Sequence, residues 1–192
     1  MDRKLVAWGR AVKSARRDGG MPSLWLFTDR ARLADPCAAE ARLPRGLCGV
    51  VFRHDDDPGR VALGRRLAGI CRERRLALVV AGDWRLAAAL GAGVHLRGGR
   101  GRVKGGGLVT SSAHSARELV QARRAGAGLV FLSPAFVTAS HPGGVGRGAA
   151  RWLALARRYG GAAEVGALGG VGGENVRRLA GCRVVAAIAA LC

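Results

Sequence analysis

Short runs of apolar residues recur along the chain, and polar or amphipathic segments separate them. Within each run the hydrophobic residues follow one another directly, which is typical of parallel strands buried on both faces. Strands are predicted at residues 24–28, 48–52, 76–80, 93–96, 108–110, 129–132, 163–168 and 184–188. Strands separated by helices in this way favour a compact α/β fold, a (β/α)8 TIM barrel, over an open sheet.

Residues 107–141 show the repeating unit most clearly, as strand, polar corner, helix, strand and second polar corner. Ser115 and Glu118 have the spacing of a capping box at the start of the helix, and Gly126 can take the left-handed conformation that ends it. Other helices are predicted at residues 3–17, 61–74, 86–90, 149–159 and 175–180. Both polar corners then lie where ligands bind in α/β proteins, and the second one carries Ser133, Thr138, Ser140 and His141.

The 192 residues are enough for one well-packed domain. Residues 1–22 are predicted to be an N-terminal basic helix and linker, and residues 23–192 a single TIM-barrel domain. A glycine-rich segment replaces a helix between the fourth and fifth strands. Because the chain stops shortly after the eighth strand, the final helix is predicted to be truncated or absent.

Several classes of protein are disfavoured by the sequence. No apolar run approaches the roughly 20 residues of a membrane span, and the N-terminal segment lacks the apolar core and cleavage site of a signal peptide. A soluble, cytoplasmic protein is therefore expected. The five cysteines are far apart and form no CxxC pair, which indicates reduced thiols rather than disulfides or a zinc site.

The formal net charge of +19 suggests another class of function, a basic nucleic-acid-associated protein. Residues 97–104 (RGGRGRVK) even resemble an RGG tract. Ten arginines, however, occur as five pairs on the polar faces of predicted helices, and a single tyrosine leaves no platform for stacking bases. No specific nucleic-acid binding is therefore expected.

Ordered motifs between residues 24 and 191 carry a family resemblance. They are LWLFTD, GVVFR, GVHL, SSAH, SPAFVTASH and GALGGV. In this order they resemble the thiamine phosphate synthase superfamily, which includes the thiazole tautomerases. The resemblance implies a barrel in thiamine biosynthesis whose carboxyl-terminal mouth binds a thiazole phosphate and, in synthases, hydroxymethylpyrimidine pyrophosphate. In the synthase reaction the pyrimidine loses pyrophosphate, and Mg²⁺ and cationic side chains neutralise that leaving group.

The thiazole half of the site is matched in this chain. The resemblance assigns two glycines to the thiazole phosphate, a dipeptide at the end of the eighth strand to a second phosphate loop, and hydroxyl residues to substrate contacts. These residues are Ser112, Thr138, Ser140, Gly169, Gly170, Ile188 and Ala189. Taken alone, the two glycines would also suit a tight turn, and Ser112 and Thr138 would also suit helix caps.

The pyrophosphate half departs from the family. Arg53 matches an arginine of the second strand, but Asp55 and His141 replace two lysines. Neither metal-binding aspartate is matched, which makes Mg²⁺ a doubtful cofactor. Two alternatives follow: Asp83 moves into the metal position, or a cationic loop replaces the metal as the counter-charge of pyrophosphate. The cations of that loop are Arg97, Arg100, Arg102 and Lys104.

His114 ends the fifth strand, where tautomerases resemble this chain in having a proton-shuttling histidine. It could equally form only local hydrogen bonds before Ser115. His95 is interpreted as a structural residue of the barrel wall, and residues 55–57 as a turn into the next helix.

The working function is a thiamine phosphate synthase-like transferase that acts on small phosphorylated molecules. Its candidate catalytic residues are Arg53, Ser112 and His114, and Arg100 and His141 are further candidate substrate contacts. A thiazole tautomerase-like isomerase and a non-catalytic thiazole-phosphate binder are the alternatives. A homo-oligomer is left open.

Overall fold

The computed structural model describes residues 1–192 except 17–19, 34, 104–105 and 139–144. Parallel strands close into a barrel in sequence order, so that β1 pairs with both β2 and β8. The strands are β1 (Leu24–Phe27), β2 (Cys48–Phe52), β3 (Ala77–Ala81), β4 (Gly93–Arg97), β5 (Val109–Ala113), β6 (Leu129–Leu132), β7 (Glu164–Leu168) and β8 (Val185–Ala187). The predicted (β/α)8 fold is confirmed.

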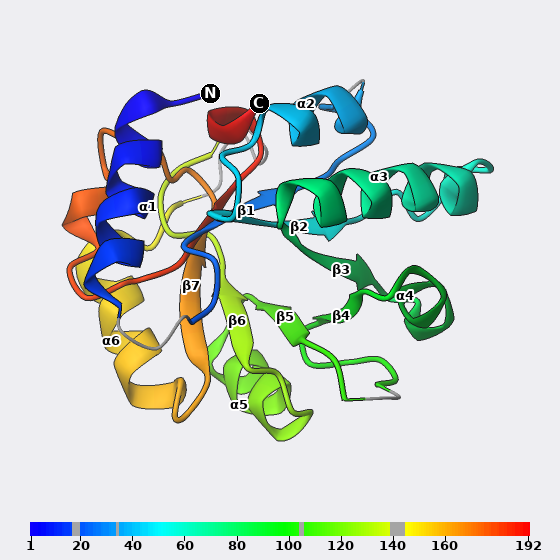
Figure 1. Ribbon diagram of the computed structural model, residues 1–192. Coiled ribbons are helices and arrows are strands. Elements are labelled where there is room, and N and C mark those ends of the chain that lie inside the picture. Colours follow the sequence, from blue (N-terminus) through cyan, green and yellow to red (C-terminus); the bar gives the residue numbers. More distant parts are fainter. Residues whose placement is uncertain (17–19, 34, 104–105, 139–144) are drawn as a thin grey trace.

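Helices cover the outside of the barrel (Figure 1). They are α1 (Arg3–Ala15), α2 (Pro36–Arg42), α3 (Arg60–Arg74), α4 (Trp84–Leu90), α5 (Ala116–Arg124) and α6 (Ala149–Tyr159), with two single 3-10 turns, η1 (Val176–Arg178) and η2 (Ala189–Leu191). In the part of the chain that the structure describes, no helix is long and apolar enough to cross a membrane.

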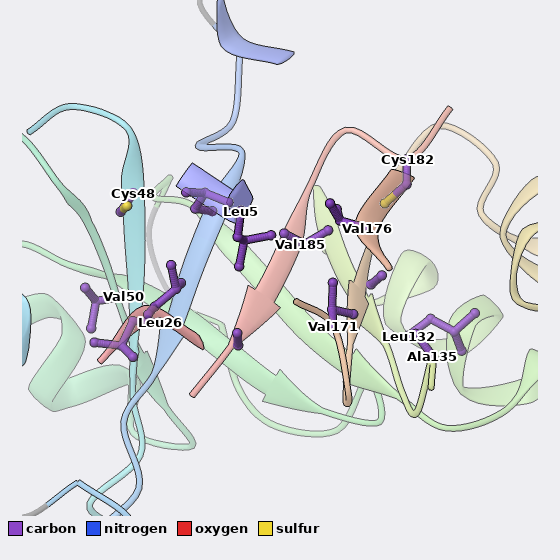
Figure 2. Packing of buried hydrophobic residues seen from close by; sticks show 14 of the residues in the cluster. Leu5, Leu26, Cys48, Val50, Leu132, Ala135, Val171, Val176, Cys182 and Val185 are labelled. Carbon is purple, nitrogen blue, oxygen red and sulfur yellow. The ribbon is translucent and has the colours of Figure 1, made fainter. Parts of the chain in front are cut away.

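Helix α1 packs along the barrel wall beside β1 and β8, where a final helix would otherwise lie. Its Leu5 is fully buried in the outer core, and Figure 2 shows this side chain next to Val185. A Cβ atom at Gly9 would come within 2.7 Å of Leu24 Cγ, so the glycine permits close contact with β1. The predicted boundary at residue 22 falls between this helix and β1.

Side chains fill the barrel interior. Trp25, Phe27 and Phe131 meet edge to face, with ring centroids 5.6 Å apart for Trp25 and Phe131 and 5.0 Å apart for the two phenylalanines. Gly49 on β2 makes room for them, because a Cβ atom there would lie 2.6 Å from the Trp25 ring. Because side chains fill the interior, a ligand would bind at the rim of the barrel.

Helix α5 begins and ends at the predicted residues. Ser115 Oγ accepts the N–H of Glu118 at 3.2 Å, and Gly126 has a φ of +84°. The carboxylate of Glu118 reaches back to the N–H of His114, at 2.6 Å, rather than to that of Ser115. The capping box is therefore shifted by one residue at its acidic end.

Three elements differ from the sequence predictions. The predictions miss α2, although Asp35 Oδ1 accepts the N–H of Ala38 at 3.0 Å and a proline follows the cap. Strand β5 continues past its predicted end at Thr110, because the hydroxyls of this segment find partners in the wall; Ser111 Oγ, for example, accepts the N–H of Gly99 at 3.0 Å.

The helix predicted at 175–180 is only the turn η1, since glycines at 172–173 and 181 bound it closely. Two predicted absences hold among the described residues: no helix joins β4 to β5, and only η2 follows β8.

Candidate active site at the barrel rim

All strands end at one rim because they are parallel, and alternation along each strand decides which rim residues face the barrel axis. Val51 belongs to the inner cluster, so Arg53 lies on the inner side at the end of β2. His95 contacts the inner aromatic rings, so Arg97 ends the inner face of β4, and Ser112 is its register partner on β5. The rim therefore brings Arg53, Arg97 and Ser112 together.

The glycine pair after β7 has the geometry of an anion-binding loop. Gly169 and Gly170 have φ angles of +90° and +65°, which side chains other than glycine rarely adopt. A Cβ atom at Gly170 would lie 2.2 Å from Val137 O, so only glycine fits under the β6–α6 loop. The backbone N–H groups of both glycines bond to no other described residue, which leaves them available to phosphate oxygens.

Two side chains brace this loop from behind. Asn175 Nδ2 donates to Gly170 O at 2.7 Å, and Asn175 Oδ1 accepts the N–H of Gly172 at 3.0 Å. Asp2 Oδ2 accepts the N–H of Gly173 at 2.6 Å. The N-terminus of α1 thus supports the glycine loop directly.

The remaining predicted substrate contacts lie on the same rim where the structure describes them. Ile188 packs against the inner cluster, and Ala189 is exposed at the start of η2. Thr138 is half-buried on the loop after β6. Ser140 and His141 lie outside the described residues, so their predicted contacts stay predictions.

Arg53 is held through its backbone. Thr28 Oγ1 accepts the N–H of Arg53 at 2.9 Å, and its own hydrogen can then bond to His54 Nδ1 at 3.0 Å. Burial lowers the pKa of His54, although nearby aspartates oppose this, and the imidazole is therefore neutral near pH 7. The Arg53 guanidinium lies over the Phe27 ring, 5.8 Å from its centroid, at the inner edge of the rim.

His95 is a structural residue, as predicted. It is 2% exposed, and its Nδ1 lies 2.8 Å from Thr110 Oγ1. Burial, followed by the positive charges of Arg53 and Arg97, lowers its pKa to about 3. A histidine that stays neutral across the physiological range does not suit proton transfer at this site.

His114 is exposed at the end of β5, and an arginine holds its backbone. Arg147 Nη2 donates to the carbonyl oxygen of His114 and, at 3.5 Å, to that of Ser133. Arg147 Nε is buried without a hydrogen-bond partner in the described structure. Arg147 therefore ties together the loops that follow β5 and β6.

The acidic run at 55–57 forms the predicted turn into α3. Asp57 Oδ1 accepts the N–H of Gly59 at 2.7 Å. Asp55 instead pairs with two arginines, Arg97 at the end of β4 and Arg60 at 3.1 Å. The turn thus places a carboxylate among the cations of the rim.

Comparison with known proteins supplies the family. Residues 24–191 match the thiamine monophosphate synthase family. This chain belongs to that family. It is 31% identical to the thiamine biosynthesis bifunctional protein ThiED of Geobacter sulfurreducens, over 94% of this chain and 39% of that protein. The chain therefore spans about two fifths of the length of this curated relative.

Solved structures similar to this synthase-family chain support the fold. The thiamine phosphate pyrophosphorylase of Pyrococcus furiosus matches with a TM-score of 0.73 and 21% identity, over 88% of this chain and 86% of that one. An HpcH/HpaI aldolase/citrate lyase family protein of Burkholderia cenocepacia matches with a TM-score of 0.58 and 18% identity, over 95% and 92% of the two chains.

The described residues do not fit the magnesium site that the synthase family implies. Asp83 is the N-cap of α4, and its Oδ1 accepts the N–H groups of Arg85 and Leu86, each at 3.0 Å. In the segment after β4, Arg100 is exposed and its N–H bonds to Arg97 O at 2.9 Å. No group of three or more His, Cys, Asp or Glu residues in the described ranges could hold an ion. Asp83 as a metal ligand stays a prediction.

Sequence reasoning misses three residues that shape this synthase-family site. The sequence predictions place Asn175 only at a helix start, and they place Arg60 and Arg147 in no element. The motif GVG before Arg147 offered no signal, but Asn175 follows a glycine-rich loop, where an amide side chain commonly bonds to the backbone.

Proposed function

We propose that this protein binds a phosphorylated thiazole and joins it to hydroxymethylpyrimidine pyrophosphate, with arginines in place of a metal ion as the counter-charge. The observation that carries the proposal is the position of Arg53 and Arg97 on the inner side of the rim that also carries the Gly169–Gly170 loop. The loop supplies bare N–H groups for a phosphate, and the guanidinium groups suit a pyrophosphate.

The proposed reaction needs negative charge to be stabilised at the leaving group. The C–O bond of the pyrimidine methylene breaks and its electron pair leaves with pyrophosphate. The lone pair of the thiazole nitrogen then forms the new C–N bond. Cations fixed beside the departing oxygen lower the barrier to the first step, because they need no rearrangement as charge develops. Ser112, half-buried opposite Arg97 in the β4–β5 register, would donate a hydrogen bond to a substrate oxygen.

The reducing cytoplasm is the compartment that we propose for this reaction. All five cysteines are free, and four of them are buried. Burial raises the pKa of Cys182 to about 11 and that of Cys48 to about 12, so these thiols stay protonated and unreactive at neutral pH.

Formation of thiamine phosphate from the two substrates tests the proposal, once with Mg²⁺ and once with a chelator. Product that survives the chelator and falls at least tenfold in Arg53→Gln supports arginine-assisted transfer. Product that requires Mg²⁺ and disappears in Asp83→Asn would overturn the metal-free mechanism, since asparagine still caps α4 but is a poor magnesium ligand.

A tautomerase-like isomerase is the second candidate, and the exposed imidazole of His114 at the end of β5 favours it. An imidazole at this position can both take a proton and give one. Isomerisation of a thiazole phosphate that is lost in His114→Gln, with no thiamine phosphate formed under either condition, would decide for this candidate.

A further inference from the structure

Asp55 forms ion pairs with two arginines at the rim, Arg97 and Arg60, whose positive charges could otherwise bind an anionic substrate. Its Oδ2 pairs with Arg97 Nη2, and its Oδ1 lies 3.1 Å from Arg60 Nη2. These partners come from separate elements, since Arg97 ends β4 and Arg60 begins α3. One carboxylate therefore neutralises cations that barrel closure has brought to the same part of the rim.

The two arginines differ in how firmly they are held. Arg60 also donates to Ala81 O at 2.7 Å, its Cζ lies 5.7 Å from the Phe52 ring centroid, and its side chain is 17% exposed. The side chain of Arg97 is 57% exposed, and in the described structure its guanidinium bonds to Asp55 alone. Arg97 is therefore the partner that can exchange Asp55 for another anion.

Arg97 lies close enough to the proposed pyrophosphate subsite for such an anion to be the substrate. Arg97 lies on the inner side of the rim, as does Arg53, and both positive charges act on the buried His95 ring. Arg53 has no ion pair with a carboxylate in the described structure. An oxyanion that entered the rim beside Arg53 would compete with Asp55 for Arg97.

We propose that Asp55 is a built-in competitor for the anionic substrate: it occupies Arg97 in the free protein and releases it to a pyrophosphate group, while Arg60 keeps Asp55 in place. This inference rests on the proposed pyrophosphate subsite and adds a residue that sets its affinity. A carboxylate at this position lowers affinity for any oxyanion, and it disfavours a weakly charged ligand most, because only a strong anion repays the broken ion pair.

Calorimetric titration of the purified protein with inorganic pyrophosphate, in the presence of a chelator, measures the effect without turnover. Asp55→Asn should bind pyrophosphate about three- to fivefold more tightly than the wild type, which is the upper part of the range expected when one partly exposed ion pair is removed. Asp56→Asn is the matched control, because Asp56 is exposed, carries the same charge and forms no ion pair in the described part of the chain. Its affinity should stay within about twofold of the wild type.

A double variant identifies Arg97 as the residue that Asp55 occupies. Arg97→Gln should bind pyrophosphate more weakly than the wild type does. Adding Asp55→Asn to Arg97→Gln should restore little of the lost affinity. Circular dichroism and thermal unfolding of each variant report whether the fold is retained.

Three outcomes would overturn the inference: unchanged or weaker binding in Asp55→Asn, an equal gain in Asp56→Asn, or no pyrophosphate binding to the wild type and Asp55→Asn alike. Pyrophosphate binding that follows the expected pattern, without formation of thiamine phosphate, would refute the proposed reaction and leave the role of Asp55 standing.

Discussion

Glu40 of α2 is a buried carboxyl group whose replacement should stabilise the barrel. Its side chain is fully buried between α2 and α3. Oε1 accepts a weak hydrogen bond from Cys71 Sγ at 3.5 Å, and Oε2 has no partner in the described structure. Burial raises the pKa of Glu40 to about 8, from 4.5 in a solvated chain, although the bond from Cys71 opposes the rise.

The raised pKa determines how stability depends on pH. Between pH 4.5 and about 8 the folded protein keeps a proton that the unfolded chain has released, so the free energy of unfolding falls as the pH rises. Below pH 4.5 both states are protonated and Glu40 costs nothing through ionisation. Above pH 8 the cost is complete, and a separation between 4.5 and 8 corresponds to at most about 5 kcal/mol. That is a large fraction of the roughly 5–15 kcal/mol that stabilises a domain.

Glu40→Gln removes this dependence while keeping the shape of the side chain. Urea unfolding followed by tryptophan fluorescence, at pH 4, 6, 7.5 and 9, should give nearly equal stabilities at pH 4 and a variant more stable by about 3–5 kcal/mol at pH 9. Glu73→Gln, which removes an exposed carboxylate from α3, should follow the wild type throughout. The reasoning is refuted if the two curves of Glu40→Gln and wild type run parallel from pH 4 to pH 9.

Two further predictions concern the glycine loop and its support. Gly170→Ala puts a Cβ atom 2.2 Å from Val137 O at a φ of +65°, so it should abolish binding of a thiazole phosphate and lower the free energy of unfolding by at least about 1–2 kcal/mol. The control Gly69→Ala, in α3 with no atom near the added Cβ, should be neutral or slightly stabilising. Calorimetry measures the ligand affinity and urea unfolding the stability, and an unchanged affinity in Gly170→Ala would contradict the prediction. Burial opposes ionisation of Asp2, but hydrogen bonds from the N–H groups of Gly173 and Leu5 outweigh it and lower its pKa, so Asp2 stabilises the fold above pH 3.8 and loses this effect as the pH falls through its lowered value. Asp2→Ala should therefore cost about 1 kcal/mol at pH 7 and lower Tm there by about 2–4 °C, and the difference from wild type should shrink as the pH falls below 3.8. A difference in thermal unfolding that stays constant as the pH falls below 3.8 would exclude the ionised cap as its cause.

The fold could be predicted because most strands are marked by an apolar run within their own residues. Runs such as Cys48–Phe52 and Leu129–Leu132 are apolar without interruption, and the structure places strands at those same residues. Hydroxyl groups blurred the pattern at β5, because Ser111 and Ser112, which follow the predicted end of the strand at Thr110, look like a polar corner. Thr110 and Ser111 lie inside the wall because His95 on β4 and Gly99 just after β4 supply hydrogen-bond partners, and such partners become visible only when β4 and β5 are paired.

In the candidate site, too, features set by a single position could be predicted from the sequence, and features set by distant partners could not. The turn at Gly169 and Gly170 could be predicted from the sequence, because its backbone conformation requires glycine at each position. The ion pairs of Asp55 could not be predicted, because a carboxylate has no fixed role until its neighbours are known. Asp55 reads as one acid of a turn, yet it meets an arginine 42 positions away, and Arg147 reaches a carbonyl 33 positions away. Both contacts exist only because parallel strands end at one rim. The charged contacts of the rim are therefore formed by residues that barrel closure brings together, and no sequence motif contains both partners of either contact.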